Sequence, residues 1–133
     1  LIFQQFYLIP NYTALENVMF PMQINQIKDE RNKAIKILSD IGLDHRKNNL
    51  PSELSGGEQQ RVAIARAISF NPEIILADEP TGNLDRKNTE IVSDLLLNYS
   101  SKKKISLILV THNMNLAKKC DRVIKLIDGC IKV

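Results

Sequence analysis

A pair of glycines behind a serine is the first feature of this sequence whose residue types could do chemistry. Ser55 and Glu58 have the S-x-x-E spacing of a capping box, which predicts a helix with Gly56 and Gly57 in its first turn. Glycines let an anion approach the main-chain N–H groups, and the helix dipole attracts negative charge to that end. Phosphate is the natural ligand there, although a capped core helix with a glycine turn would show the same short string.

The second feature is a pair of acids behind an apolar run. Residues 74–77 read Ile-Ile-Leu-Ala, and Asp78 and Glu79 follow directly. If the run is a strand of a parallel sheet, both carboxylates lie at its carboxyl edge, where open α/β folds bind ligands. Adjacent acids repel each other unless a cation neutralises one, so the pair indicates a metal ion and a proton to be moved. A solvated turn before Pro80 would explain the same residues without chemistry.

The histidines and cysteines carry weaker signals. His112 follows a second apolar run, where it could donate a hydrogen bond to a phosphate oxygen, and by itself a plain loop residue is the better interpretation. His45 lies in a polar connection and is assigned no role. Cys120 and Cys130 stand ten positions apart without metal-ligand spacing, so we predict buried or half-buried free thiols.

Helical segments are predicted before and between these features. Thr13 and Glu16 have capping-box spacing, which predicts a short helix that Pro21 ends quickly. A second, amphipathic helix is expected from about Lys28, with Gly42 as its left-handed C-terminal cap. The apolar positions that define it are Ala34, Ile37, Leu38 and Ile41.

Two strands of a parallel sheet are expected at 74–78 and 106–110. Both are apolar without polar alternation, which is typical of strands covered on both faces. Residues 91–99 carry apolar positions at helical spacing and predict the crossover helix of a βαβ unit. Asp128-Gly129 is the pair that a tight type I′ hairpin prefers, with strands on either side.

Composition bounds the class of protein. The 133 residues are 44% apolar, enough for a core of one domain or a piece of one. The net charge of +3 is spread along the chain and does not indicate nucleic acid. No apolar run approaches the roughly 18 residues that a membrane span requires. The chain starts at Leu1 in a strand-like stretch, and we expect that it begins inside a domain.

Taken together, these strings resemble the ATP-binding domain of ABC transporters. Residues 54–61 (LSGGEQQR) match the family's signature motif, and residues 74–78 (IILAD) match its Walker B motif. Residues 82–85 (GNLD) resemble the D-loop, residues 110–112 (VTH) resemble the switch-histidine strand, and Phe3-Gln4 resembles the Q-loop. The five motifs stand in the family's order over nearly the whole chain.

The resemblance implies a P-loop NTPase-like parallel sheet with a helical signature subdomain, and ATP and Mg²⁺ as ligands. We expect a partial domain over 1–133, with the Q-loop and helical subdomain at about 5–70 and the catalytic core from about 71. Glu79 and His112 would be catalytic, acting on the water and the γ-phosphate. Asp78 and Gln4 would hold Mg²⁺. The residues that the resemblance places at the nucleotide are Gln4, Ser55, Gly56, Gly57, Gln59 and Asp85.

The phosphate-binding Walker A string is not found in this sequence. The five glycines are Gly42, Gly56, Gly57, Gly82 and Gly129, and none begins a G-x-x-x-x-G-K-S/T pattern. In the family this loop precedes the Q-loop, so we interpret the sequence as cut just before Gln4, with the N-terminal strands missing as well. The missing strand would lie between the one ending at Val110 and the one around 123–126, so we expect open edges there, and no ATP turnover by this chain alone.

The partners follow from the resemblance. Two such domains would close head to tail, and residues from Tyr7 to Met22 would touch a transmembrane permease subunit or domain, which places the protein at the cytoplasmic face of the membrane. No nucleic-acid partner is expected. The strings are most similar to the macrolide-export, lipoprotein-release and antimicrobial-peptide-export branch. Two alternatives stay open, a non-transport ABC ATPase of DNA maintenance or translation, and a docking or dimerisation remnant that binds no nucleotide.

Overall fold

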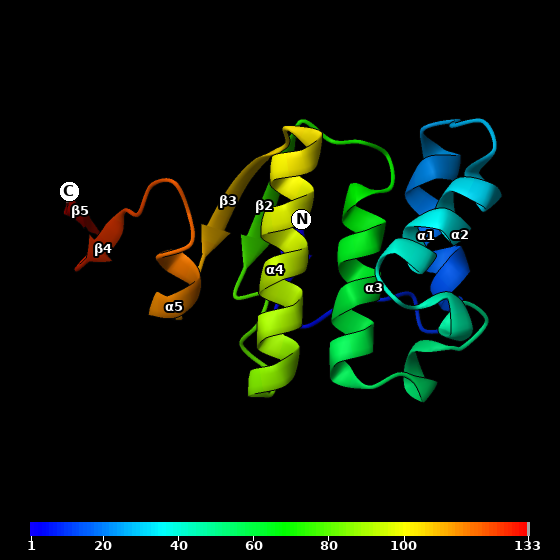
Figure 1. The fold of residues 1–133 in the computed structure, drawn as a ribbon, viewed down its shortest axis with the longest axis horizontal. Coiled ribbons are helices and arrows are strands. Elements are labelled where there is room, and N and C mark those ends of the chain that lie inside the picture. The colour runs from blue at the N-terminus through cyan, green and yellow to red at the C-terminus, as the bar shows by residue number, and fades with distance from the viewer. Residues whose placement is uncertain (133) are drawn as a thin grey trace.

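The computed structural model describes residues 1–132 and has the predicted α/β architecture, with helices packed beside and over a small parallel sheet (Figure 1). The helices are α1 (Ala14–Ile24), α2 (Glu30–Asp40), α3 (Gly56–Ile68), α4 (Arg86–Lys103) and α5 (Met114–Ala117), with 3-10 turns η1 (Asp44–Arg46) and η2 (Pro51–Glu53). The strands are β1 (Ile2–Phe3), β2 (Ile74–Asp78), β3 (Ser106–Val110), β4 (Lys125–Ile127) and β5 (Cys130–Lys132).

The parallel sheet has the order β1-β2-β3 and brings the predicted motifs to one edge. Strand β1 pairs with the end of β2, where Phe3 lies opposite Asp78. Strand β2 pairs with β3 along its whole length, so that Asp78 lies opposite Val110. Helix α4 connects β2 to β3, as expected for the βαβ unit. Because the strands are parallel, the residues that follow β1, β2 and β3 all emerge at the same edge.

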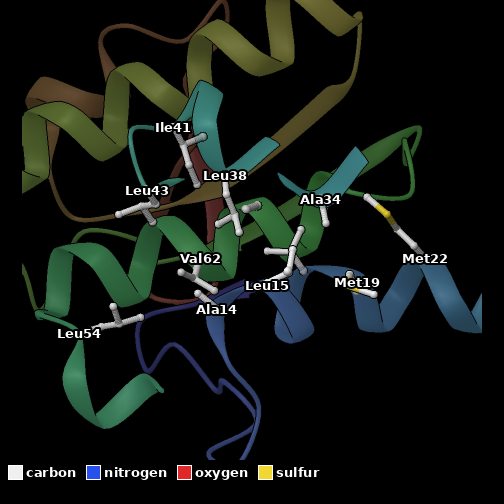
Figure 2. Packing of buried hydrophobic residues seen from close by; sticks show 12 residues of the cluster. Ala14, Leu15, Met19, Met22, Ala34, Leu38, Ile41, Leu43, Leu54 and Val62 are labelled. Carbon is white, nitrogen blue, oxygen red and sulfur yellow. The ribbon is translucent and has the colours of Figure 1, made fainter. Parts of the chain in front are cut away.

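The helical part of the chain has a core of its own (Figure 2). Helices α1, α2 and α3 and the turns between them supply its side chains, and most of these are withdrawn from water almost completely. Met22, Leu38 and Leu43 are fully buried. The buried members are Ala14, Leu15, Val18, Met19, Met22, Ala34, Leu38, Ile41, Leu43, Leu54, Val62 and Ala65.

A second core lies between the sheet and helices α3 and α4. Its buried residues are Ile2, Ile64, Ala67, Ile68, Ile75, Ala77, Val92, Leu96 and Ile105. Helix α3 therefore belongs to both cores, because its successive apolar residues face opposite sides: Val62 and Ala65 turn to the helical core, and Ile64 and Ile68 turn to the sheet. The domain boundary expected near residue 70 stays a prediction.

The prediction that the strands are covered on both faces is wrong for the described residues. Ile75 and Ala77 of β2 are buried against α3 and α4, but Ile74 is 56% exposed and Leu76 is 41% exposed. On β3, Ile108 is 56% exposed and faces away from the same core. Both helices lie on one side of the sheet, so side chains that alternate along a strand are buried only at every second position.

The helix boundaries differ from prediction at two points. Helix α1 continues through Pro21 to Ile24, because a proline removes one hydrogen bond while Met22, the next residue, is fully buried in the helical core. Helix α2 begins at Glu30 rather than near Lys28, since Asp29 has the left-handed φ of 58°. Gly42 has a φ of +72°, which confirms the left-handed cap.

The hairpin and the sheet edge agree with expectation. Asp128 and Gly129 both have positive φ angles, 50° and 75°, as a type I′ turn requires. Over residues 1–132, β3 pairs only with β2, and β4 pairs only with β5, so the expected open edge of β3 is confirmed. Cys120 is half-buried as predicted, whereas Cys130 is exposed because the hairpin extends away from both cores (Figure 1). No helix of residues 1–132 combines the length and apolar content of a membrane span.

Candidate functional site

The predicted site residues gather at one end of the molecule. Strands β2 and β3 end there, and helices α3 and α4 begin there (Figure 1). The first turns of the helices present free backbone N–H groups at this end, and the residues after the strands present their side chains there. This is the usual ligand-binding edge of an α/β fold.

The start of α3 is capped as the sequence predicts. Ser55 Oγ accepts from the Glu58 backbone N–H at 3.3 Å, and Glu58 Oε2 accepts from the Ser55 backbone N–H at 2.8 Å and from its hydroxyl at 2.9 Å. The other carboxylate oxygen, Oε1, lies 3.2 Å from Arg46 Nε. The backbone hydrogen bond from Ser55 is the main cause that holds the pKa of Glu58 below its ordinary value, and Arg46 adds to it.

The two signature glycines sit in different surroundings. A Cβ at Gly57 would lie 2.2 Å from Asn88 Oδ1 on α4, so any larger residue there would require the Asn88 side chain to move. At Gly56 the nearest atom would be Phe6 Cζ at 3.7 Å, which is ordinary contact. Gln59 donates through Nε2 to the Leu54 carbonyl at 3.1 Å and lies on the first turn, half-exposed.

The two acids at the end of β2 diverge. Asp78 is the last residue of the strand and is exposed. Glu79 turns away from it with a left-handed φ of 44°, and its Oε1 lies 2.7 Å from both the backbone N and the ring Nδ1 of His112. Thr111 Oγ1 donates to the other oxygen, Oε2, at 3.3 Å. Glu79 and His112 therefore form one contact across the ends of β2 and β3.

Gln4 is oriented by the loop after β2. Its Nε2 donates to Asn83 Oδ1 at 2.9 Å, and Asn83 Nδ2 donates back to the Gln4 carbonyl at 3.3 Å. A Cβ at Gly82 would lie 2.8 Å from Gln4 Nε2, so the loop approaches the glutamine closely. The amide nitrogen of Gln4 is thus occupied, and its Oε1 remains as the acceptor.

Asp85 is the N-cap of α4. Its Oδ1 accepts from the Asn88 backbone N–H at 2.8 Å, and its Oδ2 accepts from Asn88 Nδ2 at 2.9 Å. The backbone hydrogen bond from Asn88 is the largest cause that lowers the pKa of Asp85. Asn88 in turn packs against Gly57, so the D-loop acid and the signature glycines are connected through one side chain.

Asp78 and Gln4 are the two donors that the sequence predicts for Mg²⁺. Both offer the oxygen ligands that Mg²⁺ prefers, and this ion is commonly held by one or two carboxylates together with phosphate oxygens and water. Among residues 1–132 no group of three or more His, Cys, Asp or Glu side chains could hold a metal ion alone. The donor set fits Mg²⁺ as part of a coordination shell that phosphate and water complete.

Residues that the sequence did not single out position the segment after β1. Arg66 of α3 is half-buried and donates to the carbonyls of Tyr7 at 2.6 Å and Phe6 at 3.1 Å, and its partial burial lowers the pKa of the guanidinium. Asn17 of α1 is fully buried and bonds both the N–H and the C=O of Ile9. A single arginine or asparagine within a helix carries no spacing signal, so neither role could be found by pattern.

Comparisons with known proteins show which family the chain belongs to. The sequence profile described as ABC transporter matches residues 1–82. The lipoprotein-releasing system ATP-binding protein LolD of Geobacter metallireducens is 48% identical over 130 residues, which are 96% of this chain and 58% of that protein.

Solved structures of an ABC transporter cassette also match this chain. One described as the dimeric structure of MJ0796, a bacterial ABC transporter cassette, matches with a TM-score of 0.86 and 43% identity, over 99% of this chain and 60% of that one. A second, described as a dimeric post-hydrolysis state of the same cassette bound to ADP and Pi, matches with a TM-score of 0.86 and 42% identity, at the same coverage. The chain thus spans less than two thirds of these relatives, and it belongs to the ABC transporter family of ATP-binding proteins.

Proposed function

We propose that these residues form part of a protein that hydrolyses ATP to drive an ABC transporter for the export or extraction of lipoproteins or related cargo. The observation that carries the proposal is the contact between Glu79 and His112 at the ends of β2 and β3. It joins a carboxylate that can accept a proton to an imidazole that can reach an anion, in a family whose solved cassette MJ0796 is described as bound to ADP and Pi.

Glu79 is suited to hold the attacking water. Two hydrogen bonds from His112 reach Oε1 and fill its two lone-pair sites, whereas one from Thr111 reaches Oε2, so Oε2 keeps a lone pair for a water. Because a carboxylate only accepts hydrogen bonds, the ring Nδ1 carries the proton in this contact. The ring then donates to a γ-phosphate oxygen through Nε2 when it is an imidazolium.

The signature helix acts on the nucleotide of a second copy. Ser55, Gly56 and Gly57 offer a hydroxyl and main-chain N–H groups at the positive end of α3, where a γ-phosphate held by the partner domain would be received. The relative MJ0796 is described as dimeric, which supports a pair of such domains. The head-to-tail arrangement of the pair is part of the proposal. Gln59 would extend the same contact, and Asp85 would join the two sites through Asn88.

Mg²⁺ supplies charge neutralisation at the phosphates when it is bound. Asp78 at the end of β2 and the Oε1 of Gln4 would be the chain's own ligands for it. Asn83 Oδ1 accepts from the Gln4 amide nitrogen, which leaves the Gln4 Oε1 for the cation.

The permease would dock on the segment from Tyr7 to Met22, at the cytoplasmic face of the membrane. Tyr7 is 61% exposed, and Tyr12 and Phe20, which stack edge to face at 6.0 Å, are each 37% exposed. Large apolar side chains that water reaches are characteristic of interaction surfaces. Arg66 holds the Phe6 and Tyr7 carbonyls to α3, so a push on this segment is transmitted to the signature helix.

The Glu79→Gln variant of the complete ATP-binding protein tests the proposal. We expect ATP turnover, followed as phosphate release, to fall by roughly 10²- to 10⁴-fold, because the amide cannot accept the proton of the water. Glu73→Gln is the matched control, since Glu73 is exposed just before the other end of β2 and should change turnover less than about twofold. Turnover by Glu79→Gln close to that of the unchanged protein would refute this assignment.

A further inference from the structure

The capping box of α3 places a carboxylate beside the serine that would meet a phosphate. Glu58 Oε2 accepts the hydroxyl proton of Ser55 at 2.9 Å and its backbone N–H at 2.8 Å. A serine hydroxyl has one proton, so while this bond holds, the proton is not available to another acceptor. The negative charge of Glu58 also opposes any anion that approaches the first turn of the helix.

Arg46 acts on the other end of the same carboxylate. Its Nε lies 3.2 Å from Glu58 Oε1, with the arginine side chain 40% exposed and the glutamate side chain 14% exposed. The guanidinium neutralises the charge of Glu58. It also weakens the hydrogen bond that the carboxylate accepts from the Ser55 hydroxyl. The cation thereby counters both effects of the carboxylate on an incoming anion.

The position of Arg46 is fixed by the helical core and not by α3. Arg46 ends the turn η1, and its backbone N–H donates to the Leu43 carbonyl at 2.9 Å. Leu43 is fully buried in the helical core. The neighbouring cation, Lys47, pairs instead with Asp44 at 3.0 Å within the same turn. Only one of the two adjacent cations therefore reaches the capping box.

We propose that Arg46 is a positioning residue for the signature serine, which neutralises Glu58 so that Ser55 can turn its hydroxyl to the γ-phosphate of a nucleotide in the partner domain. The proposal rests on the proposed function, because it requires that α3 receives a phosphate. It assigns to the turn before the signature motif a role in nucleotide affinity, separate from the hydrolytic step at Glu79.

ATP-driven dimerisation of the complete protein tests the proposal without hydrolysis. In a Glu79→Gln background, the ATP concentration for half-maximal dimer formation is measured by light scattering. We expect Arg46→Ala to raise this concentration roughly three- to tenfold, since the charge of an arginine side chain that is 40% exposed is partly screened by water and salt. Arg46→Lys, which keeps the charge, should stay within about twofold of the parent.

Removal of the opposing charge should rescue the variant. Glu58→Gln retains the S-x-x-Q capping box and lacks the carboxylate, so by itself it should need the same or less ATP than the parent. The double variant Arg46→Ala with Glu58→Gln should return to within about twofold of the Glu58→Gln protein. A role of Arg46 in packing alone would leave the double variant as impaired as Arg46→Ala.

Lys47→Ala is the matched control, because it removes one positive charge from the same turn without touching Glu58. It should shift the ATP concentration less than about twofold. Thermal unfolding of every variant is measured beside it, and Arg46→Gln replaces Arg46→Ala if the alanine protein does not fold. An Arg46→Ala variant, or Arg46→Gln in its place, that dimerises like the parent overturns the proposal, and so does a double variant without rescue. If the parent itself fails to dimerise with ATP, the proposed function fails instead.

Discussion

Helices α1 and α2 bury their apolar side chains against α3 in one core, whereas strands β2 and β3 bury only one of their two faces. Leu38 of α2 is fully buried, while Leu76 of β2, the same side chain, is 41% exposed. The helical region also contains few polar groups that could do chemistry, and the ends of the strands contain most of them. The region that carries the proposed catalytic groups is the one that its own residues enclose less completely.

The two regions differ in which elements cover their apolar side chains. Three helices can surround a core with their own apolar stripes. A parallel sheet needs a layer on each face, and α3 and α4 supply one layer only. The solved cassette MJ0796 is longer than this chain, which covers 60% of it. We expect residues of a longer protein to supply the second layer, over Leu76.

Truncation of matched leucines is expected to give the largest contrast. In the chain described here, Leu38→Ala should lower the free energy of unfolding by about 2–5 kcal/mol, because it leaves a cavity in a closed core. Leu76→Ala should lower it by less than about 1 kcal/mol, because water already reaches that side chain. Urea unfolding of both variants checks the difference.

The same two variants, Leu38→Ala and Leu76→Ala, can also be compared in the complete ATP-binding protein. There we expect the cost of Leu76→Ala to rise above about 2 kcal/mol, as the open face becomes covered. Equal costs of the two variants in the shorter chain would contradict the one-sided burial of β2. A Leu76 cost that does not rise in the longer protein would show that this face stays in water.

The elements whose signal is local could be predicted from the sequence. Both capping boxes, at Thr13 and Ser55, and the left-handed Gly42 follow from residue types a few positions apart, and each is present. The two main strands and their crossover helix were also predictable, since apolar periodicity depends only on neighbours. Coverage of the strand faces was not, because an apolar run is the same whether one layer or two will meet it.

The residues that meet at the strand ends could be identified from the sequence, but the contacts among them could not. Asp78 and Glu79 are adjacent in sequence, yet a left-handed backbone at Glu79 sends it to His112, 33 positions away. No rule of residue spacing predicts the left-handed backbone at Glu79. Arg46, Asn83 and Arg66 were missed for the same reason, because each acts through a contact with a distant segment.

Asn17 provides the second test, since it fixes the segment that leaves the sheet and enters the helical core. Its side chain accepts from the Ile9 N–H at 2.8 Å and donates to the carbonyls of Ile9, Tyr12 and Thr13. Asn17→Ala should lower the free energy of unfolding by about 2–3 kcal/mol, because it leaves buried backbone groups without partners. Urea unfolding measures this, and amide exchange at Ile9 should accelerate.

A neighbouring asparagine gives the control for this variant. Asn11 is exposed in the same loop, so Asn11→Ala should change the free energy of unfolding by less than about 0.5 kcal/mol. If the two variants lowered the free energy of unfolding by similar amounts, the loop would be held by its apolar contacts. The hydrogen bonds of Asn17 would then not be needed to join the two regions.

The smallest expected effect concerns the tip of α3, where the two regions meet. Gly57→Ala should cost about 1–2 kcal/mol of unfolding free energy, because the new Cβ would lie 2.2 Å from Asn88 Oδ1 and must turn that side chain off Asp85. Gly56→Ala, whose Cβ meets nothing closer than 3.7 Å, should be neutral or slightly stabilising.

A second substitution tests the contact with Asn88. Asn88→Ala should recover only part of the stability that Gly57→Ala loses, since Asn88 Cβ itself would lie 3.0 Å from the added atom. Equal unfolding midpoints for the two glycine variants would mean that α3 and α4 separate easily, and the signature glycines would then be selected by ligand contact alone.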